Sequence, residues 1–327
     1  MSTVSFYLRL LLRNLEFLGF LPETCYSRIA ALYYERGNYQ KAVSYWLKSE
    51  SSHAGRDARL AKYNLYHLGY CCWSLGSLRE AKGYLEKYFE IDKNNWQIAC
   101  MIATFYAVIS ENEAAFAWHA HALMLEPKLF APRVECVRLL SELGRDEEAI
   151  RYADEAFDVA TTAIEKQIAE SLKLRISGDI RQAIGILKAI VSQPDDMWVS
   201  QQFQKEDTQL MLARFQRDIG DMKAVLETLQ SAVQHEPMDP WLANELAMEY
   251  VDQDIFIDRA LSLIDDALRS QPQNAIFLDT KGQVLLKLGQ TEKGETAIES
   301  SKKSFSEYHE TKNRYRHATT SGVRSTH

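Results

Sequence analysis

The residues that most often carry catalysis or bind metals are scattered along this chain. Of its eight histidines, only His119 and His121 stand close together. Two residues apart on a helix, their side chains point to different faces, so we expect no shared metal ion. The sequence contains no phosphate-binding glycine loop, no zinc-protease motif and no nucleophile elbow. It therefore predicts a protein that is not an enzyme and that needs neither a cofactor nor a metal.

The composition narrows the classes of partner. Hydrophobic residues make up 46% of the 327 residues and charged residues 25%, with only 7 prolines and 14 glycines, which is typical of a folded, helix-rich chain. A formal charge of -7 argues against nonspecific nucleic-acid binding, because phosphate binding normally requires a basic face. The five cysteines lack any CxxC or metal-ligand spacing. We expect them to be reduced thiols in or near the core, and we expect a cytoplasmic location.

A repeating pattern in the sequence predicts the helices that must position any binding residue. Six glycines mark its turns, and two other residues fill the gaps: Gly37, Gly76, Ser110, Gly144, Gly178, Gly220, Asp254 and Gly289. The steps between these positions are 39, 34, 34, 34, 42, 34 and 35 residues. Apolar residues at helical spacing flank each turn, which predicts helix hairpins. Such units cannot bury their apolar faces alone, so copies stack into a solenoid.

The hairpins also carry particular residue types at fixed offsets. Repeat 3, for example, has Ile102, Ala103, Tyr106, Ala115, Ala122 and Pro127. Repeats 6 and 8 depart from the pattern, with Val225 and Gly294 at the small alanine position. Over residues 23 to 308 the chain resembles the tetratricopeptide repeat family. The resemblance implies an all-α, right-handed superhelix of about eight helical hairpins, with cap helices at both ends.

Two insertions interrupt the period and suggest how the chain is divided. We expect an N-terminal amphipathic cap helix at 1–22, repeats 1 to 5 at 23–197, repeats 6 to 8 at 198–308, and a polar helix end with a flexible tail at 309–327. The shorter insertion, around residues 51–57, is interpreted as a longer loop. The insertion between repeats 5 and 6 has two interpretations. Either the segment extends the first helix of repeat 6, which would begin near Met197 with Trp198 and Phe203 packing back on the stack, or the segment is a hinge between subdomains.

The segment 4–21 is the most apolar stretch near the start of the sequence. Arg9, Arg13 and Glu16 fall on one helical face, so the segment is amphipathic rather than membrane-spanning, and it lacks the pattern of a signal peptide. We expect it to cap the first repeat. Two alternatives are a dimerisation helix, which would make a homo-oligomer, and a peripheral membrane anchor.

The resemblance implies that the first helix of each hairpin lines a concave groove. At the lining offsets, repeats 1 and 2 carry aromatic side chains: Tyr34, Tyr63, Tyr66, His67, Tyr70 and Trp73. Rigid amphipathic rings are favoured anchors for a partner. The alternative interpretation is that some rings, above all Tyr70 and Trp73, pack between neighbouring helices.

Repeats 4 to 6 carry arginines at the same offsets: Arg138, Arg175, Arg214 and Arg217. Acidic residues accompany them: Glu135, Glu142, Glu165, Asp207 and Asp218. Arginines in a cleft bind carboxylates of a partner, or they pair with acidic neighbours on their own helix, as Arg214 could with Asp218. The lysine and asparagine clamp by which some family members bind a C-terminal carboxylate is absent, because its positions hold Ser27, Ala31, His67, Gln97 and Met101.

These patterns predict a scaffold or adaptor that binds a protein or peptide segment, acidic or aromatic-rich, in a concave groove. No nucleic-acid partner and no transmembrane segment are expected. Two other functions stay open. One is a cytoplasmic assembly or secretion chaperone for an aggregation-prone subunit, and the other is an architectural protein that self-assembles through its N-terminal helix.

Overall fold

The computed structural model describes residues 25–51, 58–198, 203–234 and 238–302. Within these residues every regular element is a helix, which confirms the expected all-α class. The chain divides into two compact units, Met1–Lys93 and Asn94–His327. The predicted N-terminal helix at 1–22 and the C-terminal tail at 309–327 lie outside the described residues, and the predicted segment boundaries stay predictions. No described helix combines the length and apolar character needed to cross a bilayer.

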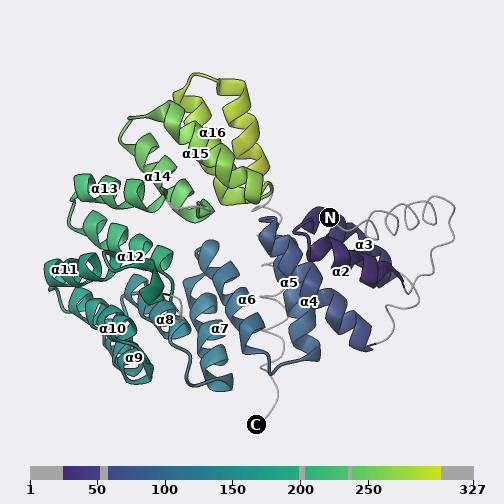
Figure 1. The fold of residues 1–327 in the computed structure, drawn as a ribbon, viewed down its shortest axis with the longest axis horizontal. Coiled ribbons are helices and arrows are strands. Elements are labelled where there is room, and N and C mark those ends of the chain that lie inside the picture. The colour runs from purple at the N-terminus through teal and green to yellow at the C-terminus, as the bar shows by residue number, and fades with distance from the viewer. Residues whose placement is uncertain (1–24, 52–57, 199–202, 235–237, 303–327) are drawn as a thin grey trace, which may run out of the picture. The chain divides into compact units, whose positions relative to one another are not determined.

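The described part of unit 1 consists of two antiparallel helix hairpins, in purple to blue in Figure 1. The first joins α2 (Tyr26–Tyr34) to α3 (Tyr39–Ser51), and the second joins α4 (Ala58–Ser74) to α5 (Leu78–Ile91). The second hairpin closes tightly because its contact residues are small. A Cβ added to Gly69 would lie 2.5 Å from Cδ2 of Leu85, and Ala81 is fully buried between the two helices.

Buried polar side chains fix the third helix of unit 1 against the first two. The hydroxyls of Ser27 and Ser49 lie 2.7 Å apart, and Ser27 donates to the Asn64 amide oxygen over 2.8 Å. The Asn64 amide nitrogen donates to Ser49 over 3.0 Å. All three side chains are buried, so a slip of one helix would leave polar atoms without partners, at a cost of about 1–3 kcal/mol each. The network therefore specifies how α2, α3 and α4 meet.

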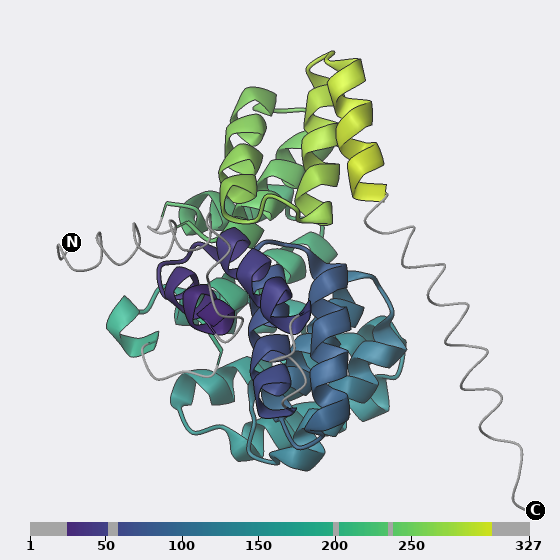
Figure 2. The ribbon, with the colours of Figure 1, turned by 90° about the vertical axis from the view of Figure 1, so that its right-hand side faces the viewer.

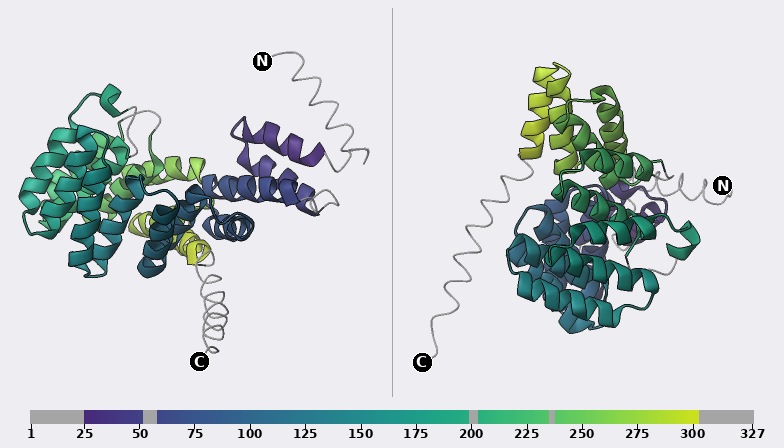
Figure 3. Two further views of the ribbon diagram at one scale, coloured as in Figure 1. Left: turned by 90° about the horizontal axis from the view of Figure 1, so that it is seen from below. Right: turned by 90° about the vertical axis from the view of Figure 1, so that its left-hand side faces the viewer.

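Unit 2 continues the same pattern with hairpins whose successive helices contact one another. Its elements are α6 (Trp96–Val108), α7 (Asn112–Leu125), α8 (Ala131–Glu142), α9 (Asp146–Val159), α10 (Ala163–Ile176), α11 (Ile180–Val191), the 3-10 helix η3 (Asp195–Trp198), α12 (Lys205–Asp218), α13 (Met222–Ala232), α14 (Pro240–Asp252), α15 (Ile257–Ser270), α16 (Ala275–Lys287) and the helical residues 291–302. Figure 2 shows the green to yellow helices at the end of this unit standing side by side. Figure 3 shows the teal helices α8 to α11 packed in a layer.

The turns within the hairpins confirm the predicted register. All eight positions of the repeating pattern adopt the left-handed backbone conformation, including Ser110 (φ 59°) and Asp254 (φ 56°). At each turn the following amide bonds back to a carbonyl five residues earlier, as Arg145 does to Leu140 over 2.9 Å. Glycine is preferred there because it adopts this conformation without the steric cost of a Cβ.

The residues around the second insertion pack on the repeats. Trp198 and Phe203 are buried in a core cluster that also contains Phe130 of repeat 4 and Phe215 of α12. This packing agrees with the first interpretation of the insertion, but the helix itself begins later than expected, at Lys205 rather than near residue 197. A second cluster joins α12 to α16 around Tyr250 and Phe277.

The cysteines are free thiols, as the sequence suggested. Cys71, Cys72 and Cys136 are buried, and Cys25 and Cys100 are partly buried. Burial raises the pKa of the Cys71, Cys72 and Cys100 thiols to about 12, so these groups stay protonated and pack as small apolar side chains.

Candidate functional site

The aromatic residues predicted in repeats 1 and 2 pack mainly on one another. We define the aromatic cluster as Tyr34, Tyr39, Trp46, Tyr63, Tyr66, His67 and Tyr70. Tyr34 lies at its centre, with ring centroids 5.8 Å from Tyr39, 5.8 Å from Trp46, 5.0 Å from His67 and 5.6 Å from Tyr70. Burial raises the pKa of Tyr34 to about 12, so its hydroxyl stays protonated.

His67 stacks within the same cluster and does not act as an ionisable group at neutral pH. Its ring lies flat on Trp46, with a centroid distance of 4.8 Å and an interplanar angle of 9°, and Tyr63 approaches it at 4.3 Å. Burial lowers the pKa of His67, and its Nδ1 atom has no hydrogen-bond partner among the described residues. The neutral ring therefore packs as an aromatic side chain.

The members of the aromatic cluster differ in how much of each side chain is exposed to solvent. Trp46 is fully buried, Tyr63 is 42% exposed, and Tyr34, Tyr66, His67 and Tyr70 lie between these extremes. Trp73, on the last turn of α4, is also partly buried. The structure thus brings five of the six predicted residues together, and Tyr63 is the one that presents most surface to water.

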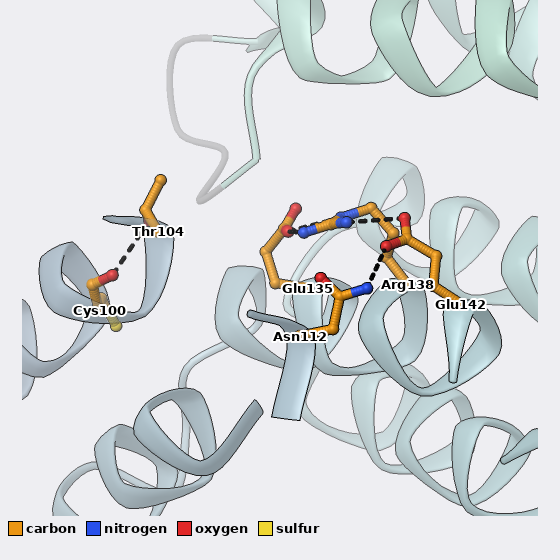
Figure 4. A network of polar contacts seen from close by, with 6 residues as sticks. All are labelled: Cys100, Thr104, Asn112, Glu135, Arg138 and Glu142. Atoms are coloured by element: carbon orange, nitrogen blue, oxygen red, sulfur yellow. Dashed lines mark hydrogen bonds and ion pairs between the residues drawn. The ribbon is translucent and has the colours of Figure 1, made fainter. Parts of the chain in front are cut away.

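In unit 2, Arg138 is held by carboxylates of its own helix. It bonds Glu135 over 2.9 Å and Glu142 over 2.8 Å, and Asn112 of α7 donates to Glu142 over 3.0 Å. Figure 4 shows the guanidinium group between the two carboxylates. Burial alone would lower the pKa of Arg138, but these two carboxylates raise it. The other bond in Figure 4, from the Thr104 hydroxyl to the Cys100 carbonyl, is local to α6.

Two more of the predicted arginines reach across to the first helix of the next hairpin. Arg175 of α10 pairs with Asp218 of α12 over 2.8 Å and lies over the Phe215 ring. Arg217 of α12 pairs with Glu249 over 3.0 Å and with Glu245 over 3.4 Å, both on α14. The suggested pairing of Arg214 with Asp218 is therefore wrong, because Arg175 occupies that carboxylate.

Arg214 stands apart from the other three arginines. Its side chain is exposed, and it makes no hydrogen bond or ion pair with any residue that the structure describes. Surrounding protein nevertheless dehydrates the guanidinium group and lowers its pKa, and the positive charge of Arg138 acts in the same direction.

Asp207, two turns earlier on α12, is the acidic counterpart of Arg214. It is exposed and accepts a hydrogen bond from the Gln204 amide, but no described cation pairs with it. Burial, together with the negative charges of Glu135 and Asp239, raises the pKa of its carboxyl to about 6. Glu165, by contrast, is fully buried and accepts hydrogen bonds from Thr161, so it belongs to the start of α10.

Together these side chains define a charged face of unit 2, formed by Glu135, Arg138, Glu142, Asp207, Arg214, Arg217, Glu245 and Glu249. Asp207 and Arg214 are exposed, and burial by the surrounding protein nevertheless shifts the pKa of each group toward its neutral form. The prediction omitted Glu245 and Glu249. Glu245 falls at the same lining offset in repeat 7 as Glu135 does in repeat 4, so extending the offsets by one repeat would have found it.

His119 lies beneath this face and was not expected to take part in it. The ring is buried on α7, and burial lowers its pKa to about 4, with the charges of Glu135 and Arg138 acting in opposite directions. No group of three or more histidine, cysteine or carboxylate side chains in the described part of the chain is arranged to hold a metal ion.

The comparisons with known proteins agree with this architecture. A sequence model described as tetratricopeptide repeat matches residues 63–95. This stretch of the chain is therefore a tetratricopeptide repeat. No curated protein matches the sequence.

Solved structures extend the likeness beyond a single repeat. A tetratricopeptide repeat protein from Parabacteroides merdae is similar over 80% of this chain and 98% of its own, with 13% identity and a TM-score of 0.54. This likeness shows the shared fold. The MamA protein is similar over 52% of this chain and 90% of its own, with 16% identity and a TM-score of 0.44. The APC/C hetero-tetramer Cut9-Hcn1 is similar over 83% of this chain and 51% of the matched chain, with 16% identity and a TM-score of 0.45. The tetratricopeptide repeat fold supports a role in protein–protein interaction.

Proposed function

We propose that this tetratricopeptide repeat protein is a non-catalytic scaffold that holds a segment of a partner protein on the charged face of unit 2. The observation that carries the proposal is Arg214. A guanidinium group offers five donors in a fixed fork, and every other arginine of this face uses that fork on a neighbouring carboxylate. Among the arginines of this face, only Arg214 is dehydrated without a hydrogen bond or ion pair to a described residue.

The energetics favour a small number of contacts at this face. A hydrogen bond to a charged group contributes about 1.5–3 kcal/mol when the group is already partly dehydrated and held in place. The ion pairs of Arg138, Arg175 and Arg217 keep the surrounding side chains in fixed positions before a partner arrives. Such pre-organisation reduces the entropic cost of binding, so a few well-placed contacts supply most of the affinity.

A photo-cross-linking residue tests where the partner binds. We place it at Glu245, whose side chain is 42% exposed on α14, and at Lys223 as the control, whose side chain is 88% exposed on α13. In cells, we expect a protein to be cross-linked from position 245 and not from position 223. Arg214→Gln in the position 245 background should reduce the cross-linked yield on the order of tenfold. Equal yields from both positions, or none from position 245, would contradict the proposal.

The aromatic cluster is a second candidate contact surface in unit 1. Tyr63 presents an exposed ring, and Tyr66 and Tyr70 are partly exposed beside it. Tyr66 and Tyr70 also pack on His67 and Tyr34, so replacing both would disturb the fold as well as the surface. Tyr63→Ser is the cleaner test. We expect it to weaken partner recovery in a pull-down while the helical circular dichroism stays unchanged; full recovery would leave these rings with a packing role only.

The remaining hypotheses rest on parts of the sequence outside this face. Self-assembly and peripheral membrane binding would depend on residues 4–21, which lie outside the described residues. The chaperone role and the cytoplasmic location stay predictions. A chaperone's client should be insoluble when the chain is absent, whereas a scaffold's partners should fold alone.

A further inference from the structure

Along α12 the charged face has an acidic group at one end and a basic group at the other. The inference drawn from this arrangement rests on the proposed function and specifies the partner segment. Asp207 and Arg214 are seven residues apart, so their side chains lie on the same side of the helix, about 10 Å apart along its axis. Neither group has an ion-pair partner among the described residues, whereas the other charges of the face are paired. One end of the helix face therefore lacks a cation, and the other end offers unused donors.

The surroundings of Asp207 favour a positive charge. Glu135 of α8, Asp239 at the start of α14 and Glu206 all add negative potential at its carboxylate. Asp239 already accepts the amides of Trp241 and Leu242, and Glu135 already bonds Arg138. A partner ammonium or guanidinium group at Asp207 would relieve the repulsion between Asp207 and its three acidic neighbours without breaking an existing bond.

The surroundings of Arg214 favour an acceptor oxygen. Glu135, Glu142 and Glu245 lie near enough to affect its charge, but each is already committed to Arg138 or Arg217. The guanidinium group can therefore donate to an incoming carboxylate or to a main-chain carbonyl. Both are oxygen acceptors of hydrogen bonds, and they differ only in that the carboxylate carries a negative charge.

We propose that the surface of α12 between Asp207 and Arg214 is a two-point site for an extended segment of a partner protein, with a lysine or arginine at Asp207 and an acceptor oxygen at Arg214. An extended chain covers about 10 Å with three residues. A helical partner is disfavoured, because an amphipathic helix needs an apolar groove and this face is lined by Glu135, Arg138 and Glu142. An extended segment instead presents main-chain donors and acceptors to a polar surface.

Selection from a phage-displayed library of random peptides, about a dozen residues long, tests this site on the full chain. The wild-type protein should enrich peptides with a basic residue at one fixed position. Selection on Asp207→Lys should enrich an acidic residue at that position instead. For a wild-type-selected peptide, Asp207→Asn and Arg214→Gln should each weaken binding on the order of tenfold, as measured by fluorescence anisotropy.

The controls separate a failure of this site from a failure of the scaffold. Glu227→Gln on α13, whose side chain is 67% exposed, should leave peptide affinity unchanged. Circular dichroism should show that the Asp207 variants keep their helix content, because Asp207 also caps α12. The two-point site would be overturned if the enriched peptides lacked a fixed basic position, or if Asp207→Lys selected the same motif as the wild type. A library that yields no binders would also overturn it. Cross-linking from position 245 would still support the scaffold in each of these cases.

Replacing the acidic residues of a selected peptide identifies the acceptor at Arg214. If a carboxylate is required, their change to amides should weaken binding to the wild type but have little further effect on Arg214→Gln. If a main-chain carbonyl suffices, the amide peptide should bind as well as the parent peptide. A motif with its charged residues seven apart would instead indicate a helical partner and overturn the extended one.

Discussion

The aromatic cluster of unit 1, on α2, α3 and α4, and the charged face of unit 2, on α8, α12 and α14, belong to hairpins of one repeating pattern, but their side chains find partners in different ways. In unit 1 the rings stack on one another around Tyr34 and His67, so the cluster is nearly complete without a partner. On the charged face of unit 2 the other charges are paired, but Asp207 and Arg214 have no ion-pair partner among the described residues. The same repeat architecture can therefore present a surface whose side chains are satisfied within the protein, or one with charged groups that lack a partner.

The difference follows from the geometry that each kind of interaction requires. Aromatic rings are large and tolerate several contact angles, so neighbouring rings usually find a favourable edge or face. An ion pair requires one donor and one acceptor within bonding distance, and a carboxylate that is taken by one arginine is lost to another. Asp218 shows this competition, since Arg175 binds it and Arg214 is left over.

Replacing one ring of the aromatic cluster should give the largest loss of stability. Trp46 is fully buried and contacts Tyr34, Tyr63 and His67. We expect Trp46→Ala to destabilise the protein by about 3–5 kcal/mol in urea unfolding, because it removes a large buried side chain and leaves a cavity. Hydrogen exchange measured by mass spectrometry should place the loss of protection in α2 to α5.

Arg214→Ala is the matched change on the charged face. It removes an exposed side chain with no described partner, so we expect a change within about 0.5 kcal/mol. A loss comparable with that of Trp46→Ala would show that Arg214 supports the fold, and the contrast between the two regions would fail.

The turns offer a test of what the two units share. Gly37 in unit 1 and Gly144 in unit 2 have φ values of 68° and 70°, and a Cβ at either position would meet no atom within 4 Å. Gly37→Ala and Gly144→Ala should therefore cost the same, about 1–2 kcal/mol each, because only the left-handed backbone opposes the substitution. Ser110→Gly should have the opposite sign, stabilising the protein by up to about 1 kcal/mol, since Ser110 already has a φ of 59°.

Urea denaturation followed by circular dichroism measures all three glycine and serine variants. Clearly unequal costs for Gly37→Ala and Gly144→Ala would mean that the two units do not share one hairpin geometry, in spite of their common sequence period.

The sequence predicts the hairpins well because their signals are local. A glycine at the end of a helix and apolar residues at helical spacing determine the turns at Gly144 and Gly220 without help from distant residues. The lining offsets likewise placed Arg138 and Arg214 on helices that contribute to one face. The aromatic residues were assigned to the right helices for the same reason.

What the sequence could not supply depends on contacts between distant residues. The pairing of Arg175 with Asp218 spans 43 positions, and the rule for neighbours on one helix favoured Arg214 instead. Whether Tyr34 faces a partner or other rings depends on how α2, α3 and α4 meet, which the buried Ser27, Ser49 and Asn64 network specifies. The helix α12 starts at Lys205 because Gln204 and Asp207 form a capping box there, a local signal that the expected start near Met197 overlooked.

The dependence of stability on pH should be the smallest effect, and it should differ between the units. Asp207 has a pKa of about 6 in the folded protein against about 3.9 in an unfolded chain. Between these values the folded state holds a proton that the unfolded state releases, so Asp207 makes stability fall as the pH rises from 4 to 6. His119 acts in the opposite sense. Its pKa is about 4 when folded against 6.5 when unfolded, so it makes stability rise over the same interval.

These two contributions should partly cancel in unit 2 and should separate when either group is removed. Asp207→Asn should steepen the rise in stability between pH 4 and pH 6, and His119→Gln should flatten it, as followed by urea midpoints at several pH values. The aromatic cluster contains His67, whose pKa is also lowered by burial, and no carboxylate to oppose it, so protection of unit 1 in hydrogen exchange should rise across this interval. Unchanged slopes in both variants would mean that the carboxylate and imidazole of unit 2 are as well hydrated as in an unfolded chain. The charged face would then be fully hydrated, and the unpaired state of Arg214 would no longer distinguish it from an ordinary surface arginine.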